Sequence, residues 1–260
     1  THLYLSRNNL GYIPPEIGNI NTLIYLSLNS NSLVELPPEI GNLTNLTHLT
    51  LGSNSLSYLP HEISNLNNLT VLGLIANDLG NVSFEIGSLN KLTELGLGYN
   101  DLSYVPSEIG NLTSLINLGL EGNSLNYLPR EIGNLTSLRR LYLNNNTLSH
   151  LPSEIGNLTE LRELYLTDNS FSNLPHEIGI LTNLERLTMD AELWEQIPDE
   201  VRRLGTPTVV VTYIRNQAQW HLRRMVGSAV LMGAGVITVI LLLVRRRRLG
   251  RKPKQKRGEG

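Results

Sequence analysis

The chain has 260 residues and no cysteine, and its 21 basic and 23 acidic residues leave it close to neutral. The absence of cysteine excludes disulfide bonds and thiolate metal sites. Only two Phe and two Trp are present, which favours a leucine-filled solenoid over a compact globule with an aromatic core.

A phrase of 23 residues recurs along the first three quarters of the chain. Residues 128–148 read LPREIGNLTSLRRLYLNNNTL, and residues 151–171 read LPSEIGNLTELRELYLTDNSF. A fixed period of this length indicates a solenoid of stacked units. One isoleucine keeps its phase in every unit, at Ile17, Ile40, Ile63, Ile86, Ile109, Ile132, Ile155 and Ile178. An asparagine follows each L-x-x-L-x-L run, at Asn8, Asn31, Asn54, Asn77, Asn100, Asn123, Asn146 and Asn169.

Each unit is predicted to hold one strand and one short helical return. The alternation at Leu138, Leu141 and Leu143 suits a strand with inward leucines, whereas PSEIGNL suits a tight helical turn opened by proline. One unit cannot bury its own leucines, and each buried leucine contributes about 1.5 to 3 kcal/mol, so stability must come from stacking. The asparagine amides both donate and accept, and we expect them to form a buried ladder that satisfies backbone groups of adjacent repeats.

The unit L-P-x-E-I-G-N-L-x-x-L-x-x-L-x-L-x-x-N-x-L resembles the leucine-rich repeat family, specifically its 23-residue Ras-suppressor-like type. This resemblance implies an α/β fold, a solenoid with a curved parallel β-sheet and short helical returns. We assign the repeats to residues 1–192. Thr1 falls inside a repeat, so we expect the N-terminus to be truncated.

The repeat pattern decays at its C-terminal end. Met189 takes a leucine phase, Glu192 takes the asparagine phase and Trp194 takes the next apolar phase. We therefore predict a C-terminal cap over residues 193–216, similar to the closing element of bacterial leucine-rich repeat proteins, and a juxtamembrane linker over residues 217–224.

Residues 225–244 carry no charge for 20 positions, and a helix of that length spans about 30 Å of hydrocarbon. We predict one transmembrane α-helix here, with a buried core helix or the apolar region of a signal peptide as the alternatives. Residues 1–224 hold 12 basic and 22 acidic residues, a net charge of −10, while the basic tail 245–260 has a net charge of +8. The positive-inside rule then predicts a cytoplasmic tail, close to anionic lipids, and extracytoplasmic repeats.

The same region bears on two further kinds of partner, a second copy of the chain and a nucleic acid. Ala229 and Gly233 form a small-x-x-x-small pair that could seat a homodimer through the helix. The basic tail is explained as a stop-transfer cluster, so no nucleic-acid partner is expected.

No enzyme, metal site or cofactor is expected. A zinc protease needs H-E-x-x-H, but Asn65 and Ile180 stand where the second histidine should follow His61-Glu62 and His176-Glu177. No glycine-rich phosphate loop is present either.

The outward positions between the leucines should form rows across a concave face. We predict that this face binds ligand through Glu94, Tyr99, Glu121, Arg140, Tyr142, Glu163, Tyr165 and Arg186, because tyrosine and arginine are favoured interface anchors. The alternative is that opposite charges on neighbouring strands only keep the sheet soluble. Bare glycines lie between these residues, at Gly73, Gly96, Gly98, Gly119 and Gly122. A second tyrosine column, Tyr12, Tyr58, Tyr104 and Tyr127, is expected to stack along a flank.

The sequence thus predicts a membrane-anchored module that recognises a protein or peptide. Two alternatives stay open. The absence of cysteine and the bacterial-type cap suit a cytosolic tail-anchored scaffold, and a structural surface protein that binds nothing is the third hypothesis.

Overall fold

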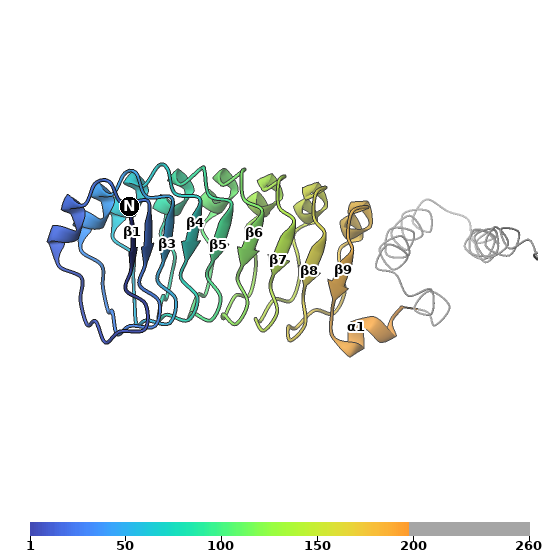
Figure 1. The fold of residues 1–260 in the computed structure, drawn as a ribbon. Coiled ribbons are helices and arrows are strands. Elements are labelled where there is room, and N and C mark those ends of the chain that lie inside the picture. Colours follow the sequence, from blue (N-terminus) through green and yellow to red (C-terminus); the bar gives the residue numbers. More distant parts are fainter. Residues whose placement is uncertain (198–260) are drawn as a thin grey trace, which may run out of the picture. The chain divides into compact units, whose positions relative to one another are not determined.

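The computed structural model describes residues 1–197, which form a solenoid of stacked turns (Figure 1). Its nine strands make one parallel sheet in sequence order, and each strand pairs with the next in a register of 23 residues. Each strand has three residues and a leucine at its centre. The strands are β1 (His2–Tyr4), β2 (Tyr25–Ser27), β3 (His48–Thr50), β4 (Val71–Gly73), β5 (Glu94–Gly96), β6 (Asn117–Gly119), β7 (Arg140–Tyr142), β8 (Glu163–Tyr165) and β9 (Arg186–Thr188).

The return in each repeat is a single 3₁₀ turn of five residues. A residue in extended conformation precedes every turn, and it is proline in all but one repeat, because proline fixes φ near the required value. The eight returns are η1 (Pro15–Asn19), η2 (Pro38–Asn42), η3 (His61–Asn65), η4 (Phe84–Ser88), η5 (Ser107–Asn111), η6 (Arg130–Asn134), η7 (Ser153–Asn157) and η8 (His176–Ile180). Because 3₁₀ geometry is stable only in short pieces, the returns stay short.

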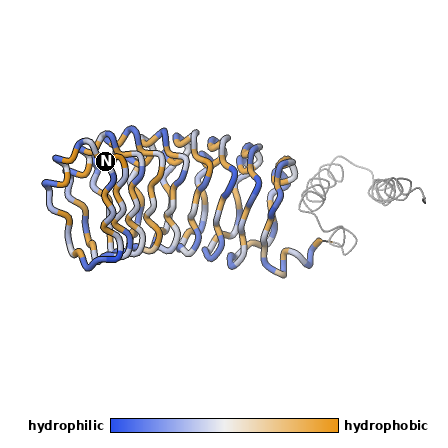
Figure 2. Tube along the Cα trace, in the orientation of Figure 1, coloured by the Kyte–Doolittle hydropathy of each residue, from blue (hydrophilic) through white to orange (hydrophobic). Residues whose placement is uncertain are grey.

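One continuous core of leucine and isoleucine runs through the repeats. Leu138, Leu141 and Leu143 are fully buried, and so is Ile132 from the neighbouring return. Figure 2 shows the resulting alternation of apolar and polar stretches along each turn. Only the central leucine of the expected alternation lies in the strand itself, since Leu138 and Leu143 flank β7.

The repeated asparagines link consecutive repeats. Asn100 donates from Nδ2 to the carbonyls of Leu74 and Leu97, both at 3.0 Å, and accepts at Oδ1 from the Leu79 N–H at 3.2 Å. Leu74 and Leu79 belong to the preceding repeat, so one buried amide joins two repeats. Asn8 in the first repeat is exposed and bonds only within its own repeat, to the carbonyls of Leu5 and Ser6.

A glycine in most returns lets neighbouring returns pack closely. A Cβ added to Gly110 would lie 2.6 Å from the Glu131 carbonyl oxygen in the next repeat, which is closer than real contacts allow. Ser64 holds the equivalent place in η3. Glycine is therefore favoured at the third position of the E-I-G-N phrase by the close approach of two neighbouring backbones, and not by its φ angle.

The described solenoid closes on Asp190 and the short helix α1 (Ala191–Glu195). In earlier repeats the N–H of the left-handed residue donates to a backbone carbonyl of the next repeat, as Asn145 does to Thr167 at 2.9 Å. At the last complete repeat the Asp190 carboxylate replaces that carbonyl, accepting from the N–H groups of Asp168 at 2.7 Å and Asn169 at 3.3 Å. The side chain thus satisfies donors that another repeat would otherwise cover.

Within residues 1–197, no helix combines the length and apolar character that a bilayer crossing requires. The predicted transmembrane helix at 225–244, the linker, the basic tail and most of the predicted cap lie outside the described residues.

Candidate functional site

The outward side chains of the strands form two parallel rows on the strand face. The register places the first residue of each strand beside the first residue of the next, and the same holds for the third. The first row is His2, Tyr25, His48, Val71, Glu94, Asn117, Arg140, Glu163 and Arg186. The second row is Tyr4, Ser27, Thr50, Gly73, Gly96, Gly119, Tyr142, Tyr165 and Thr188.

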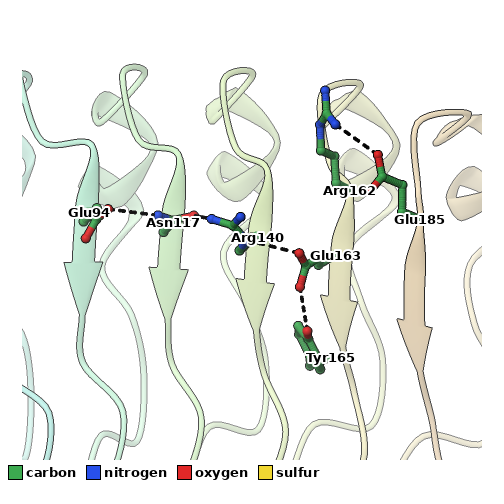
Figure 3. A network of polar contacts seen from close by, with 7 residues as sticks. All are labelled: Glu94, Asn117, Arg140, Arg162, Glu163, Tyr165 and Glu185. Carbon is green, nitrogen blue, oxygen red and sulfur yellow. Dashed lines mark hydrogen bonds and ion pairs between the residues drawn. The ribbon is translucent and has the colours of Figure 1, made fainter.

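Five of these residues form a polar chain across four strands, β5 to β8 (Figure 3). Asn117 donates from Nδ2 to Glu94 at 3.2 Å, and its Oδ1 accepts from Arg140 Nη1 at 3.1 Å. Arg140 Nε then donates to Glu163 Oε1 at 3.2 Å. The Tyr165 hydroxyl completes the chain by donating to Glu163 Oε2 at 2.6 Å. Sequence reasoning selected every member except Asn117, whose amide both donates and accepts and so links the two charged neighbours.

The electrostatics fix the charge state of the polar chain at neutral pH. The hydrogen bond from Tyr165, together with Arg140 and Arg186, lowers the pKa of Glu163 below its usual value. The same contact with the Glu163 carboxylate raises the pKa of the Tyr165 phenol, and Glu163 also raises the pKa of Arg140. Glu163 is therefore ionised, Arg140 is charged and the Tyr165 hydroxyl remains a donor.

The aromatic part of the face is a stacked pair. The rings of Tyr142 and Tyr165 lie 4.7 Å apart at an interplanar angle of 12°, and both side chains are half-buried. Within the described residues Tyr142 makes no side-chain hydrogen bond, and the buried Thr188 hydroxyl beside Tyr165 in the same row has no partner. Rigid rings with an unused hydroxyl offer a ligand both apolar area and a hydrogen bond.

Two predicted residues lie apart from the polar chain. Tyr99 has a left-handed φ of 54° in the turn that follows β5, and its ring lies over Gly122. Glu121 lies flat over Gly98, and its Oε2 is buried without a hydrogen-bond partner in the described chain. These side chains cover part of the expected bare floor, because Glu121 also reaches Gly119. The Ile75 side chain crowds Gly96, so of the three strand glycines only Gly73 would give an added Cβ ordinary contacts, with Thr50 at 3.7 Å.

The last predicted residue, Arg186, is exposed at the start of β9 and acts on Glu163 through its charge. Next to it, Arg162 Nη1 donates to Glu185 at 3.0 Å, a pair that sequence reasoning did not select (Figure 3). Both partners are exposed, so this pair contributes little stability and is free to exchange with a ligand.

An aromatic cluster at the N-terminal end of the same face was also missed. The Tyr4 and Tyr25 rings are 5.1 Å apart, those of Tyr25 and His48 are 5.4 Å apart, and His2 lies 6.0 Å from Tyr25. These residues stand at the same positions of the repeat as Arg140 and Tyr142, so an alignment of all the repeats identifies them.

The flank tyrosines do not behave as expected. Tyr12, Tyr58, Tyr104 and Tyr127 are all exposed, and none of their rings stacks on another, so the expected stacking is wrong. Instead the Tyr58 hydroxyl donates to Glu35 in the preceding repeat at 3.0 Å, and this carboxylate raises the pKa of the phenol.

The two His-Glu pairs lie on the opposite side of the repeats from the polar chain. His61 contacts Glu62 at 3.1 Å and His176 contacts Glu177 at 3.2 Å, each within one 3₁₀ turn. Within residues 1–197, no group of His, Cys, Asp or Glu is arranged to hold a metal ion. What the strand face presents to a ligand is hydrogen-bonding groups, charged side chains and stacked aromatic rings.

Comparison with known proteins agrees with this geometry. A family model described as "Leucine-rich repeat region" matches residues 1–101 and 77–201. A leucine-rich repeat protein of Leptospira interrogans is 43% identical, with a TM-score of 0.71, over 72% of this chain and 48% of its own. The leucine-rich repeat domain of the type III effector XopL is 27% identical, with a TM-score of 0.60, over 75% of this chain and 78% of its own.

A plant structure gives a further parallel. The ectodomain of the Arabidopsis thaliana membrane receptor kinase GASSHO1/SCHENGEN3, in complex with CASPARIAN STRIP INTEGRITY FACTOR 2, is 34% identical with a TM-score of 0.68. The match covers 73% of this chain and 24% of the ectodomain. This chain thus spans about half of the Leptospira protein and a quarter of the plant one. Curated protein sequences gave no match.

Proposed function

We propose that this chain, which belongs to the leucine-rich repeat family, is a membrane-anchored recognition module that binds a protein or peptide on its strand face. Arg140, Tyr142 and Tyr165 are its anchors, and the polar chain positions them. Residues 225–244 hold it in a membrane, with the repeats outside and the basic tail in the cytoplasm.

The observation that carries the proposal is the polar chain beside the tyrosine stack. Arg140 has two hydrogen-bonded neighbours, Asn117 and Glu163, and Tyr165 is held by Glu163 and by the ring of Tyr142. Side chains already fixed in one geometry lose little conformational entropy on binding, and that loss is a main cost of association. Tyrosine and arginine are also the residues that most often dominate binding energy.

The similarity to a receptor ectodomain solved with CASPARIAN STRIP INTEGRITY FACTOR 2 supports a protein or peptide as ligand. The repeats of this chain match a quarter of that ectodomain in length, so the identity of the ectodomain's ligand is not carried over to this chain. The chemistry of the polar chain favours a ligand that presents a carboxylate or carbonyl to Arg140 and an apolar group to the tyrosine rings.

Photo-crosslinking tests the binding surface. A benzoylphenylalanine probe replaces Tyr142 in the full chain, in the cells that make it, and a matched probe replaces the exposed Asn173 away from the strand face. We expect a protein or peptide adduct from the Tyr142 position that disappears when Arg140→Ala is added. Equal adducts from both positions, or none from Tyr142, would contradict binding at this face.

The lysines of the native sequence test the topology. Lys91 is exposed and is the one lysine before residue 225, whereas Lys252, Lys254 and Lys256 lie in the tail. A membrane-impermeant amine reagent added to intact cells should label Lys91 and spare the tail. Labelling of the tail alone, or of Lys91 only after lysis, would reverse the topology and favour the tail-anchored cytosolic scaffold.

A further inference from the structure

A second surface runs along the flank of the solenoid, where the chain approaches each 3₁₀ return. Three neighbouring depressions follow one another there. The largest, of about 720 Å³, spans Asn81 to Glu131, and one of about 450 Å³ spans Tyr12 to Pro60. A small depression between them shares Pro60 with the one of about 450 Å³ and Val82 with the one of about 720 Å³. We call this continuous surface, from the first repeat to the sixth, the flank furrow.

Aromatic rings and prolines line the flank furrow. Phe84 is 64% exposed, Tyr104 40% and Tyr127 45%. Six prolines lie among the residues that form it, at Pro15, Pro37, Pro38, Pro60, Pro106 and Pro129. Such a run of exposed aromatic side chains marks an interaction surface more often than scattered single residues do.

The flank furrow carries a net negative charge. Its carboxylates come from Glu35, Glu39, Glu85, Glu108 and Glu131, and no lysine or arginine lines any of its three depressions. Arg130, beside the furrow, pairs with Glu131 at 3.1 Å, which leaves the other four glutamates without a basic partner in the described residues. An acidic surface of this kind is complementary to a cationic ligand.

The spacing of the tyrosines fits one backbone conformation. Tyr12, Tyr58 and Tyr104 occur in every second repeat, and two strand spacings of a sheet amount to roughly 9.6 Å. A polyproline II helix repeats every three residues, or about 9.3 Å. Residues on one face of such a helix would therefore meet Tyr12, Tyr58 and Tyr104 in turn, whereas Tyr127, one repeat after Tyr104, falls between two such positions. The five repeat steps of the flank furrow, roughly 24 Å, hold about eight residues of this conformation.

We propose that the flank furrow binds an extended proline-rich peptide in polyproline II conformation, whose arginines or lysines face the row of glutamates. Aromatic-lined grooves are suited to this conformation because it is preformed and loses little entropy on docking. The site is separate from the strand face, so both can be occupied at once.

Binding of synthetic peptides to the full chain, kept in mild detergent, tests this proposal. The probe is a fluorescent (Pro-Pro-Arg)₃ peptide, and the controls are (Gly-Gly-Arg)₃, with equal charge, and (Pro-Pro-Gln)₃, with equal conformation. We expect each control to bind at least ten-fold more weakly than the probe. Equal affinity of (Gly-Gly-Arg)₃ would reduce the interaction to non-specific electrostatics, and equal affinity of (Pro-Pro-Gln)₃ would exclude the role of the glutamates.

Variants then locate the site. Combined Phe84→Ala and Tyr104→Ala should weaken (Pro-Pro-Arg)₃ at least ten-fold, while Tyr4→Ala, which removes a ring that is 67% exposed outside the flank furrow, should not. These side chains are exposed, so thermal melting should show that both variants fold. Arg140→Ala separates the two proposals, because it should abolish the adducts of the probe at position 142 and leave the affinity for (Pro-Pro-Arg)₃ unchanged. Unchanged affinity in the Phe84 and Tyr104 variant would overturn the proposal.

Discussion

Replacing Asn100 by alanine should destabilise the solenoid through one particular backbone group. The side chain accepts a hydrogen bond from the Leu79 N–H and donates to the carbonyls of Leu74 and Leu97. The two carbonyls keep a second donor in Asn100→Ala, because Asn77 Nδ2 also bonds Leu74 and Asn123 Nδ2 also bonds Leu97. The Leu79 N–H loses its side-chain acceptor and is left unsatisfied in the interior.

The expected loss follows from that accounting. A buried donor left without an acceptor costs about 1 to 3 kcal/mol. Asn100 is 5% exposed, so water does not readily replace its oxygen. Urea unfolding of the full chain, followed by circular dichroism, should show a lower midpoint with an unchanged slope, which assigns the change to stability and not to the unfolded state.

Asn8→Ala is the matched control. Asn8 makes the same kind of contact to the Leu5 carbonyl at 2.9 Å but is exposed and accepts no hydrogen bond from an N–H group of the described chain. Its loss should therefore change the free energy of unfolding by less than about 0.5 kcal/mol. An unchanged midpoint in Asn100→Ala, or an equal loss in both variants, would refute the reasoning that the stranded N–H sets the cost.

Three further outcomes are expected. Gly110→Ala should lower the free energy of unfolding by about 1 to 3 kcal/mol, because the new Cβ would meet the backbone of the next return. Gly11→Ala, with open space around it, should leave the urea midpoint unchanged. Equal midpoints for the two variants would show that the stack of repeats adapts to the added Cβ. Tyr165→Phe should raise the pKa of Glu163 toward the ordinary value of about 4.3, measured by ¹³C NMR titration. Because the pKa of Glu163 is lowered in the folded protein, the ionised carboxylate stabilises the fold above the ordinary pKa, and this stabilisation is lost as the pH falls through the folded pKa. The urea midpoints of the wild type and Tyr165→Phe should therefore converge in acid. A difference that stays constant with pH would exclude this linkage. Asp190→Ala should speed amide hydrogen exchange at Asp168 and Asn169 and leave exchange in the first repeats unchanged. Exchange at Asp168 and Asn169 as slow as in the wild type would show that the carboxylate is dispensable.

The repeat period made most of the fold predictable. The leucine phases gave the strand positions and the core, and the prolines gave the start of each return, because both act locally and recur every 23 residues. The parallel register follows from the same period. Closure at Asp190 was missed, since nothing in the sequence marks a carboxylate as the substitute for a carbonyl of a further repeat.

The strand face was only partly predictable. Phase assigns Arg140, Glu163 and Tyr165 to one surface, but it does not reveal that Asn117 extends their network or that the Glu121 side chain lies down over glycine. Those outcomes depend on rotamers selected by neighbours in other repeats. The aromatic residues at the same positions of the first repeats lack the alternating charge that marks Arg140, Glu163 and Arg186, so charge pattern alone does not identify them.

The two proposed surfaces occupy different parts of the solenoid, and this has a physical consequence. The tyrosine stack lies on β7 and β8, whereas the flank furrow ends at Glu131, on the side of the returns. Since each repeat of a solenoid contacts only its neighbours, a substitution in one surface perturbs the other only through the intervening stack. A ligand on the strand face and a peptide in the flank furrow should therefore bind with independent affinities. Any measured coupling between them would require the whole stack to change its geometry, and the buried asparagine ladder, with its bonds between consecutive repeats, opposes such a change.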